Sequence, residues 1–107
     1  GKEMSIGRYY QRAGQPLAAL NRYKAVIDNE AFQRTSHTPE ALYRLVEVNL
    51  TLGLKEEATR NGAVLGFNYP GSPWYAEAYA LLTEEGARPE TAPTGQRESW
   101  LRRIIPG

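Results

Sequence analysis

The sequence predicts an all-α protein in which tetratricopeptide-like antiparallel helical hairpins stack as a short right-handed solenoid. Apolar residues recur at spacings of three and four through the first three-quarters of the chain, as on one face of a helix. The breaks in this pattern fall at Gly, Pro, Ser and Thr, which begin or end helices. The helix pairs also repeat with a period close to the 34 residues of a tetratricopeptide unit.

Composition sets limits on function. The chain has 107 residues and no cysteine, so one domain is expected and neither a disulfide nor a thiolate metal site is possible. A formal charge of +1 provides no field to gather nucleic acid, and we expect no nucleic-acid partner. No apolar run approaches the roughly 20 residues that span a bilayer. The opening Gly1-Lys2-Glu3-Met4 lacks the apolar stretch of an export signal, so an exported protein would have lost its leader here.

The first hairpin is predicted over residues 3–29. Gly14 suits a tight helix end and Pro16 a first helical position. The expected apolar stripes are Met4, Ile6, Tyr9, Tyr10 and Ala13 on the first helix, and Leu17, Leu20, Tyr23, Val26 and Ile27 on the second.

A second hairpin is predicted over residues 38–67, after a polar connecting loop. We expect Thr38 to be the N-cap, Pro39 to take the first helical position and Gly53 to end the first helix. Ser72-Pro73 repeats this start signal for a capping helix over residues 73–83, which closes a repeat region of residues 1–83.

The two hairpins align when Gly14 and Gly53 are both placed on the turn. Gly7, Tyr10, Ala19 and Tyr23 then fall on consensus positions of the tetratricopeptide repeat, and the second hairpin matches more loosely. Small residues such as Gly7, Ala19 and Ala58 are expected to let the helices approach closely. Because such stacks normally need three repeats, we expect preceding repeats or a partner to lie against the first helix.

No catalytic residue, metal site or cofactor is predicted. His37 is the sole histidine and is expected to be an exposed loop residue without an acidic ligand cluster. Acidic neighbours such as Glu56 and Glu57 point in different directions on a helix and read as a solvated face. The glycines at 62, 66 and 71 lack the strand-to-helix setting of a phosphate loop. The sequence therefore predicts a binding module and not an enzyme.

The C-terminal tail differs in composition. Residues 84–98 are rich in Gly, Pro and small polar residues and are predicted to be a flexible linker. Residues 99–105 are predicted to form a short amphipathic helix that needs a surface to fold against. Its own stack, a partner protein and the membrane headgroup region compete for this role, and membrane anchoring ranks below the other two. The candidate partner-binding residues of this helix are Trp100, Leu101 and Ile104.

Two parts of the chain carry a family resemblance. The first part resembles the penultimate repeat of the BamD family of outer-membrane assembly lipoproteins, through the Tyr9-Tyr10 pair, the turn residue Gly14 and Asn21-Arg22. The second part resembles the last repeat of alphaproteobacterial members, through Ser72-Pro73-Trp74-Tyr75. The resemblance covers residues 2–83 well and the tail loosely.

The resemblance implies a periplasmic scaffold of the machinery that inserts β-barrels. Such a protein is tethered to the inner face of the outer membrane only by an N-terminal lipid, which this sequence lacks. Its C-terminal repeats would dock on the periplasmic (POTRA) domains of BamA, with other subunits of the machine as further possible partners.

Arg22, together with Asn21, is the candidate for that contact. Arg22 is expected at the edge of the apolar arc of its helix, where its guanidinium could hold a carboxylate of the partner. The competing interpretation is a solvated charge paired with a nearby acid. Two other classes of protein remain open: another periplasmic tetratricopeptide adaptor of a cell-envelope complex, and a receptor that clamps a chain-terminal carboxylate, which ranks lower.

Overall fold

The computed structural model describes residues 2–30 and 37–86, and over these ranges the chain forms helices and no strand. The all-α fold class predicted from the sequence is confirmed. The helices are α1 (Lys2–Arg12), α2 (Pro16–Glu30), α3 (Thr38–Thr51), α4 (Lys55–Asn68) and α5 (Pro73–Glu84).

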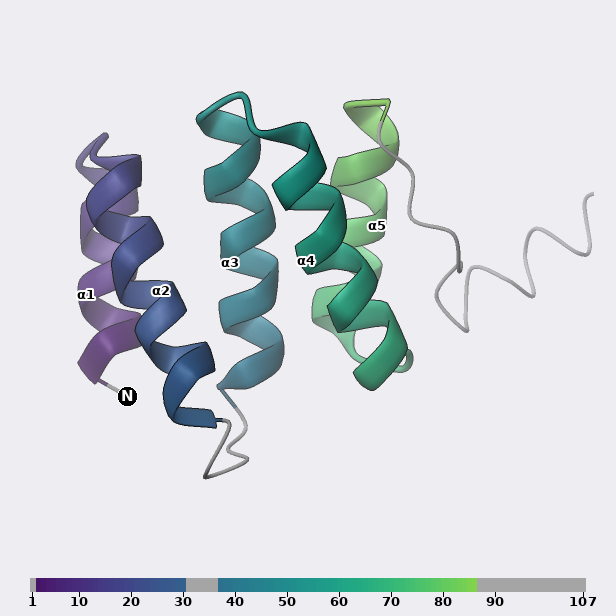
Figure 1. Ribbon diagram of the computed structural model, residues 1–107, viewed down its shortest axis with the longest axis horizontal. Coiled ribbons are helices and arrows are strands. Elements are labelled where there is room, and N and C mark those ends of the chain that lie inside the picture. Colours follow the sequence, from purple (N-terminus) through teal and green to yellow (C-terminus); the bar gives the residue numbers. More distant parts are fainter. Residues whose placement is uncertain (1, 31–36, 87–107) are drawn as a thin grey trace, which may run out of the picture.

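The helices form two antiparallel hairpins and a closing helix (Figure 1). α1 packs on α2, and α3 packs on α4. The hairpins join chiefly through α2 and α3, and α5 then packs against both α3 and α4. None of the helices in the described ranges is long and apolar enough to cross a membrane.

Both hairpin turns are built in the same way. Gly14 and Gly53 have φ angles of 75° and 79°, a left-handed conformation that glycine adopts without steric cost. Each turn closes with a backbone bond to the preceding helix, from Gln15 N–H to the Tyr10 carbonyl at 2.9 Å and from Leu54 N–H to the Asn49 carbonyl at 2.8 Å. The placement of both glycines on equivalent turns is therefore confirmed.

The predicted N-cap of α3 is wrong, whereas that of α5 is confirmed. His37 already has helical angles (φ −83°, ψ −18°) and is the N-cap of α3, so Thr38 is the first residue within the helix. The Thr38 hydroxyl is buried and has no hydrogen-bond partner among the described residues. Ser72 is extended (φ −72°, ψ 137°), so its side chain can accept a hydrogen bond from Trp74 N–H at 3.2 Å.

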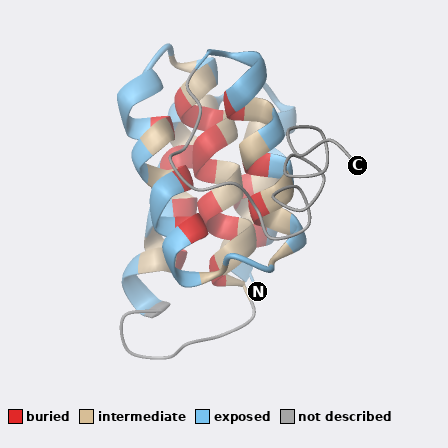
Figure 2. Cartoon of the chain, turned by 90° about the vertical axis from the view of Figure 1, so that its right-hand side faces the viewer, coloured by how far each residue is buried: buried red, intermediate tan, exposed pale blue. Residues whose placement is uncertain are grey.

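Figure 2 shows the buried residues on the sides of the helices that face one another. They form two apolar clusters, and Ile27 packs against both. Residues of α1, α2 and α3 form the first, and residues of α3, α4 and α5 form the second. Their fully buried members include Met4, Ala19, Tyr23, Ala41 and Val48 in the first and Val46, Ala58, Leu65, Tyr75 and Leu82 in the second.

Three residues of the predicted apolar stripes, Tyr9, Ala13 and Leu17, are exposed and lie outside the core. Tyr9 and Leu17 are each 61% exposed. The buried side of α1 is the one that carries Met4 and Gly7, so Tyr9 faces away from it. Leu17 lies in the first turn of α2, before Ala19, where the residues of α2 that pack against α1 and α3 begin.

Candidate protein-binding groove between α1 and α2

Asn21 and Arg22 lie together on one face of α2, beside a groove of about 430 Å³. α2 positions them there because its neighbouring residues Ala19, Leu20 and Tyr23 are buried in the core. The groove runs between α1 and α2, and its lining residues are Glu3, Tyr10, Ala18, Asn21, Arg22 and Ala25. The sequence indicated two of these six positions.

Arg22 is at the edge of the buried arc of α2, but its guanidinium is not free. Nη1 donates to Oε2 of Glu3 at 3.3 Å, which joins the start of α1 to the middle of α2. The side chains remain 41% and 34% exposed, respectively. An exposed pair of this kind contributes at most about 1 kcal/mol to folding, so it can rearrange when another charged group approaches.

At two groove positions α2 carries smaller side chains than α4 does at the corresponding positions. When Gly14 is aligned with Gly53, Ala18 and Ala25 correspond to Glu57 and Val64. Tyr10 and Arg22 correspond to Asn49 and Asn61, and a hydrogen bond of 2.8 Å between these amides joins α3 to α4. The second hairpin thus has an amide–amide hydrogen bond at the position where Tyr10 and Arg22 line the groove of the first.

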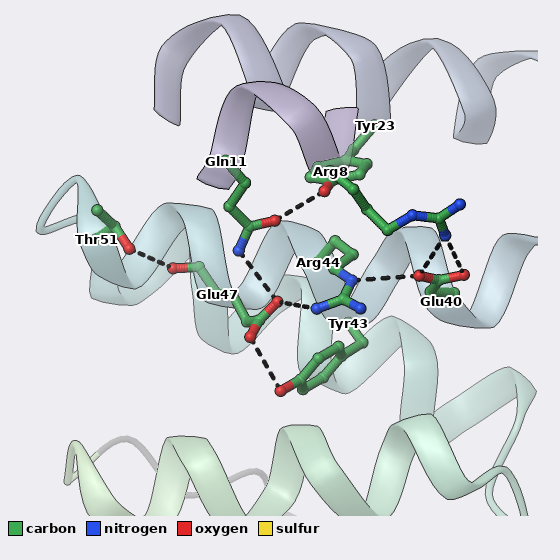
Figure 3. Close-up of polar contacts among 8 residues, drawn as sticks. All are labelled: Arg8, Gln11, Tyr23, Glu40, Tyr43, Arg44, Glu47 and Thr51. Carbon is green, nitrogen blue, oxygen red and sulfur yellow. Dashed lines mark hydrogen bonds and ion pairs between the residues drawn. The ribbon is translucent and has the colours of Figure 1, made fainter. Parts of the chain in front are cut away.

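Apart from the groove, a cluster of polar side chains links α1 to α3. Figure 3 shows how these side chains converge. Glu40 accepts hydrogen bonds from Arg8 Nη1 at 2.9 Å and from Arg44 Nε at 3.2 Å. Glu47 accepts from Arg44 Nη1 at 2.9 Å and from Gln11 Nε2 at 3.1 Å. The sequence analysis did not identify this cluster, although the spacing of residues 40, 44 and 47 is that of ion pairs on one helix face.

Two tyrosines extend this polar cluster into the core. Tyr23 donates to Gln11 Oε1 at 2.7 Å, and Tyr43 donates to Glu47 Oε2 at 3.1 Å. Burial raises the pKa of Tyr23 to about 12, and burial together with the Glu47 carboxylate raises the pKa of Tyr43 to about 12.

Arg44 is held between charges and aromatic rings. Its guanidinium carbon lies 5.5 Å from the ring centroids of both Tyr43 and Trp74. Burial opposes its charge, but the hydrogen bonds to Glu47 and Glu40 outweigh burial, and the pKa of Arg44 rises above its usual value. Because both carboxylates already accept several bonds, this cluster is better suited to joining helices than to binding a ligand.

His37 was expected to be exposed in a loop, but it is half-buried at the start of α3. Within the part of the chain that the structure describes, no group of three or more His, Cys, Asp or Glu could hold a metal ion. Trp100, Leu101 and Ile104 lie outside the described residues.

The remaining exposed apolar side chains lie mainly on α4 and the turn before it. Phe67 is 87% exposed, Val64 is 42% exposed and Leu54, at the start of α4, is 46% exposed. Val64 and Phe67 are three residues apart and share the outer side of the helix.

Comparison with known proteins places the chain in a family. The family described as "YfiO: Outer membrane lipoprotein" matches residues 1–65. Outer membrane protein assembly factor BamD of Caulobacter vibrioides is 59% identical over 98% of this chain, and its namesake in Rickettsia prowazekii is 55% identical over 77%. BamD of Neisseria meningitidis serogroup A is 35% identical over 74% of the chain.

These matches cover 34%, 32% and 29% of the three relatives, so the chain spans about a third of their length. No solved structure matches the chain. The names of the relatives are those of assembly factors, which agrees with the prediction of a protein that is not an enzyme. Because the family match covers more than half of its residues, the chain belongs to the YfiO family of outer membrane lipoproteins.

Proposed function

We propose that this chain is a protein-binding scaffold of the outer-membrane β-barrel assembly machinery. In this proposal it forms the C-terminal repeats of a BamD-like lipoprotein that docks on the periplasmic domains of BamA. It acts in the periplasm, tethered to the inner face of the outer membrane by a lipid at the N-terminus of the longer protein. The names of its relatives support the assembly role.

The observation that carries the proposal is that the exposed Asn21 and the half-buried Arg22 line the same groove. Arginine offers a planar array of donors that holds a carboxylate with two parallel hydrogen bonds. The exposed Asn21 next to it adds a side-chain amide, which can donate a further hydrogen bond. The site is thus suited to an acidic side chain on a partner protein.

The internal repeat supports an external partner for this face. α3 and α4 have a hairpin before them and α5 after them, yet Arg60 and Val64 on α4 remain exposed. These residues correspond to Asn21 and Ala25 when the two turns are aligned. Since stacking leaves these α4 positions exposed in the second hairpin, a preceding hairpin would leave Asn21 and Ala25 exposed in the first. The counterparts of Glu3 and Tyr10 on α3, Leu42 and Asn49, are buried.

A binding titration against the BamA periplasmic region tests the proposal. Arg22→Glu should weaken the complex by roughly 2 to 5 kcal/mol, because it places a charge of the wrong sign against the carboxylate of the partner. Lys24→Glu is the matched control, since Lys24 is an exposed cation on the same helix that does not line the groove. Circular dichroism and melting should be unchanged in both variants. Equal affinity of Arg22→Glu and the wild type would show that Arg22 is a solvated charge.

The tail supplies a second proposed contact. Trp100, Leu101 and Ile104 would bind a subunit of the assembly machine through the apolar side of the predicted 99–105 helix. If the chain bound another cell-envelope complex and not BamA, the alternative of a different periplasmic tetratricopeptide adaptor would replace the proposal.

A further inference from the structure

α5 ends in the same kind of turn as the first helix of each hairpin. Gly86 has a φ angle of 77°, beside 75° for Gly14 and 79° for Gly53. In all three turns the glycine N–H donates to the carbonyl oxygen three residues before it, at 3.0 to 3.2 Å. α5 therefore ends as the first helix of a hairpin does, and the two complete hairpins show where a second helix would lie beside it.

The side of α5 that would face such a second helix is open among the described residues. In the complete hairpins, Gly7 and Val46 lie seven residues before their turn glycines and are buried. Tyr79 lies at the same distance before Gly86 but is only half-buried. Its neighbours on this side are exposed or half-buried, and their spacings of three and four residues place them along one stripe. The α5 seat, as we call this stripe, consists of Ala76, Tyr79, Ala80 and Thr83.

The residues directly after Gly86 are unsuited to form this second helix. Pro93, seven residues after Gly86, takes the place that Asn21 has in the middle of α2. A proline there removes a helical hydrogen bond and clashes with the preceding turn. The first stretch beyond it with apolar residues at helical spacing is 99–105. Its apolar residues are Trp100, Leu101, Ile104 and Ile105.

The charges of the seat and of this stretch are complementary. The only charged residues of α5 are Glu77 and Glu84, and both are exposed beside the seat. The only charged residues of the 99–105 stretch are Arg102 and Arg103. An apolar contact between the two segments would therefore bring opposite charges together at its edge.

The connecting chain is long enough to reach the whole seat. α5 has 12 residues and is about 18 Å long. The 12 residues between Gly86 and Ser99 span up to about 40 Å when extended. The tail can therefore lie beside α5, as α2 lies beside α1 and α4 beside α3 (Figure 1).

We propose that residues 99–105 dock on the α5 seat of their own chain, in the place of the second helix of a third hairpin. Their apolar side chains pack on Tyr79 and on the two alanines, which leave room for them, and their arginines lie toward Glu77 and Glu84. The contact with a subunit proposed above uses the same apolar side, so the tail leaves the seat when a subunit binds it. Because a helix this short adds few contacts to the repeats, the docking is measured by the position of the tail and not by the melting temperature.

Disulfide crosslinking tests the docking, because the chain has no cysteine and two introduced cysteines are its only thiols. Ser99→Cys keeps the apolar side chains of the tail. It is combined with Ala76→Cys or Ala80→Cys in the seat, or with Ala63→Cys at an exposed position of α4 as the control. In a glutathione redox buffer, the faster seat pair should form its intramolecular disulfide about tenfold faster than the control pair, because docking raises the effective concentration of one thiol at the other. Equal rates for all three pairs would overturn the proposal.

Variants of the tail separate docking from chance encounters. Trp100→Ser should remove the advantage of the seat pair, whereas Gln96→Ser in the connecting chain should keep it. Arg102→Glu combined with Arg103→Glu should also slow the seat pair, because like charges would then meet at the edge of the seat. Disulfide-linked dimers in place of the intramolecular crosslink would make a second copy the occupant and overturn the proposal.

These measurements use the chain alone, so their outcome does not depend on the BamA titration. If the chain does not bind the BamA region but the seat pair crosslinks faster than the control, the proposed function fails and the docking stands. If the chain binds and all pairs crosslink at equal rates, the docking alone is wrong.

Discussion

Gly7 and Tyr23 are in direct contact: a Cβ added to Gly7 would lie 2.5 Å from Cε1 of the tyrosine ring. Tyr23 is fully buried, so its ring has no open side to move toward. Gly66 and Tyr75 form a similarly close pair between α4 and α5. In each pair a glycine on one helix makes room for a buried tyrosine on the next.

Gly7→Ala should therefore destabilise the protein, although alanine is the better helix former. The propensity gain of about 1 kcal/mol is outweighed by overpacking and ring displacement, which cost about 1 to 3 kcal/mol and more where the neighbour cannot move. Chemical denaturation should show a net loss of stability. Ser5→Ala on the exposed side of α1 is the control and should be neutral or slightly stabilising. A Gly7→Ala protein more stable than the wild type would contradict the close packing.

Glu40 should matter more to stability than an acid in an exposed ion pair. Its side chain is 14% exposed and bonds to both Arg8 and Arg44, so Glu40→Ala leaves Arg8 without its partner and Arg44 with Glu47 alone at a partly buried site. A loss of about 1 to 3 kcal/mol is expected. Glu57→Ala breaks the exposed pair with Arg60 and should change stability by less than about 1 kcal/mol. Equal effects in urea titrations would show that the α1–α3 cluster contributes no more than a surface pair.

Stability should fall as the pH rises from 10 toward 12. The pKa values of Tyr23 and Tyr43 are raised to about 12 in the folded chain, whereas both ionise near pH 10 when unfolded. In this window the folded state holds more protons, so each rise in pH favours unfolding. Melting temperatures measured across the window should decline, and the decline should be shallower in the Tyr23→Phe and Tyr43→Phe variants. Tyr9→Phe, at an exposed position, should leave the slope as in the wild type.

Removal of the tail should leave the thermal transition of the repeats nearly unchanged if residues 99–105 bind a partner. Truncation after Gly86 keeps the end of α5, where Glu85 N–H donates to the Leu81 carbonyl at 3.1 Å. Calorimetry of this shortened chain should give the melting temperature of the full chain within a few degrees. A fall of many degrees would show that Trp100 and its neighbours pack on the helices of their own chain.

The sequence by itself determined the helical fold, the approximate helix bounds and the alignment of the two hairpins. These features follow from local signals: apolar spacing within one helix, a glycine at positive φ in each turn, and Ser72-Pro73 at the start of α5. It also carried the family resemblance and named Asn21 and Arg22 as candidate partner-binding residues, and the structure places both in the lining of the groove. Local signals were weakest at the start of α3, where the predicted N-cap, Thr38, lies one residue after the observed N-cap, His37.

Only the tertiary structure decided which residues from separate helices meet. The Glu3–Arg22 pair joins positions 19 residues apart, and the Arg8–Glu40 bonds join positions 32 residues apart. Helical periodicity gives the direction in which a side chain points from the axis of its helix. It does not give the distance between two helices or how each helix is rotated toward the other. Those are set by how side chains such as Tyr23 pack against Gly7 in the core, and they decide which side chains complete the groove beside Arg22.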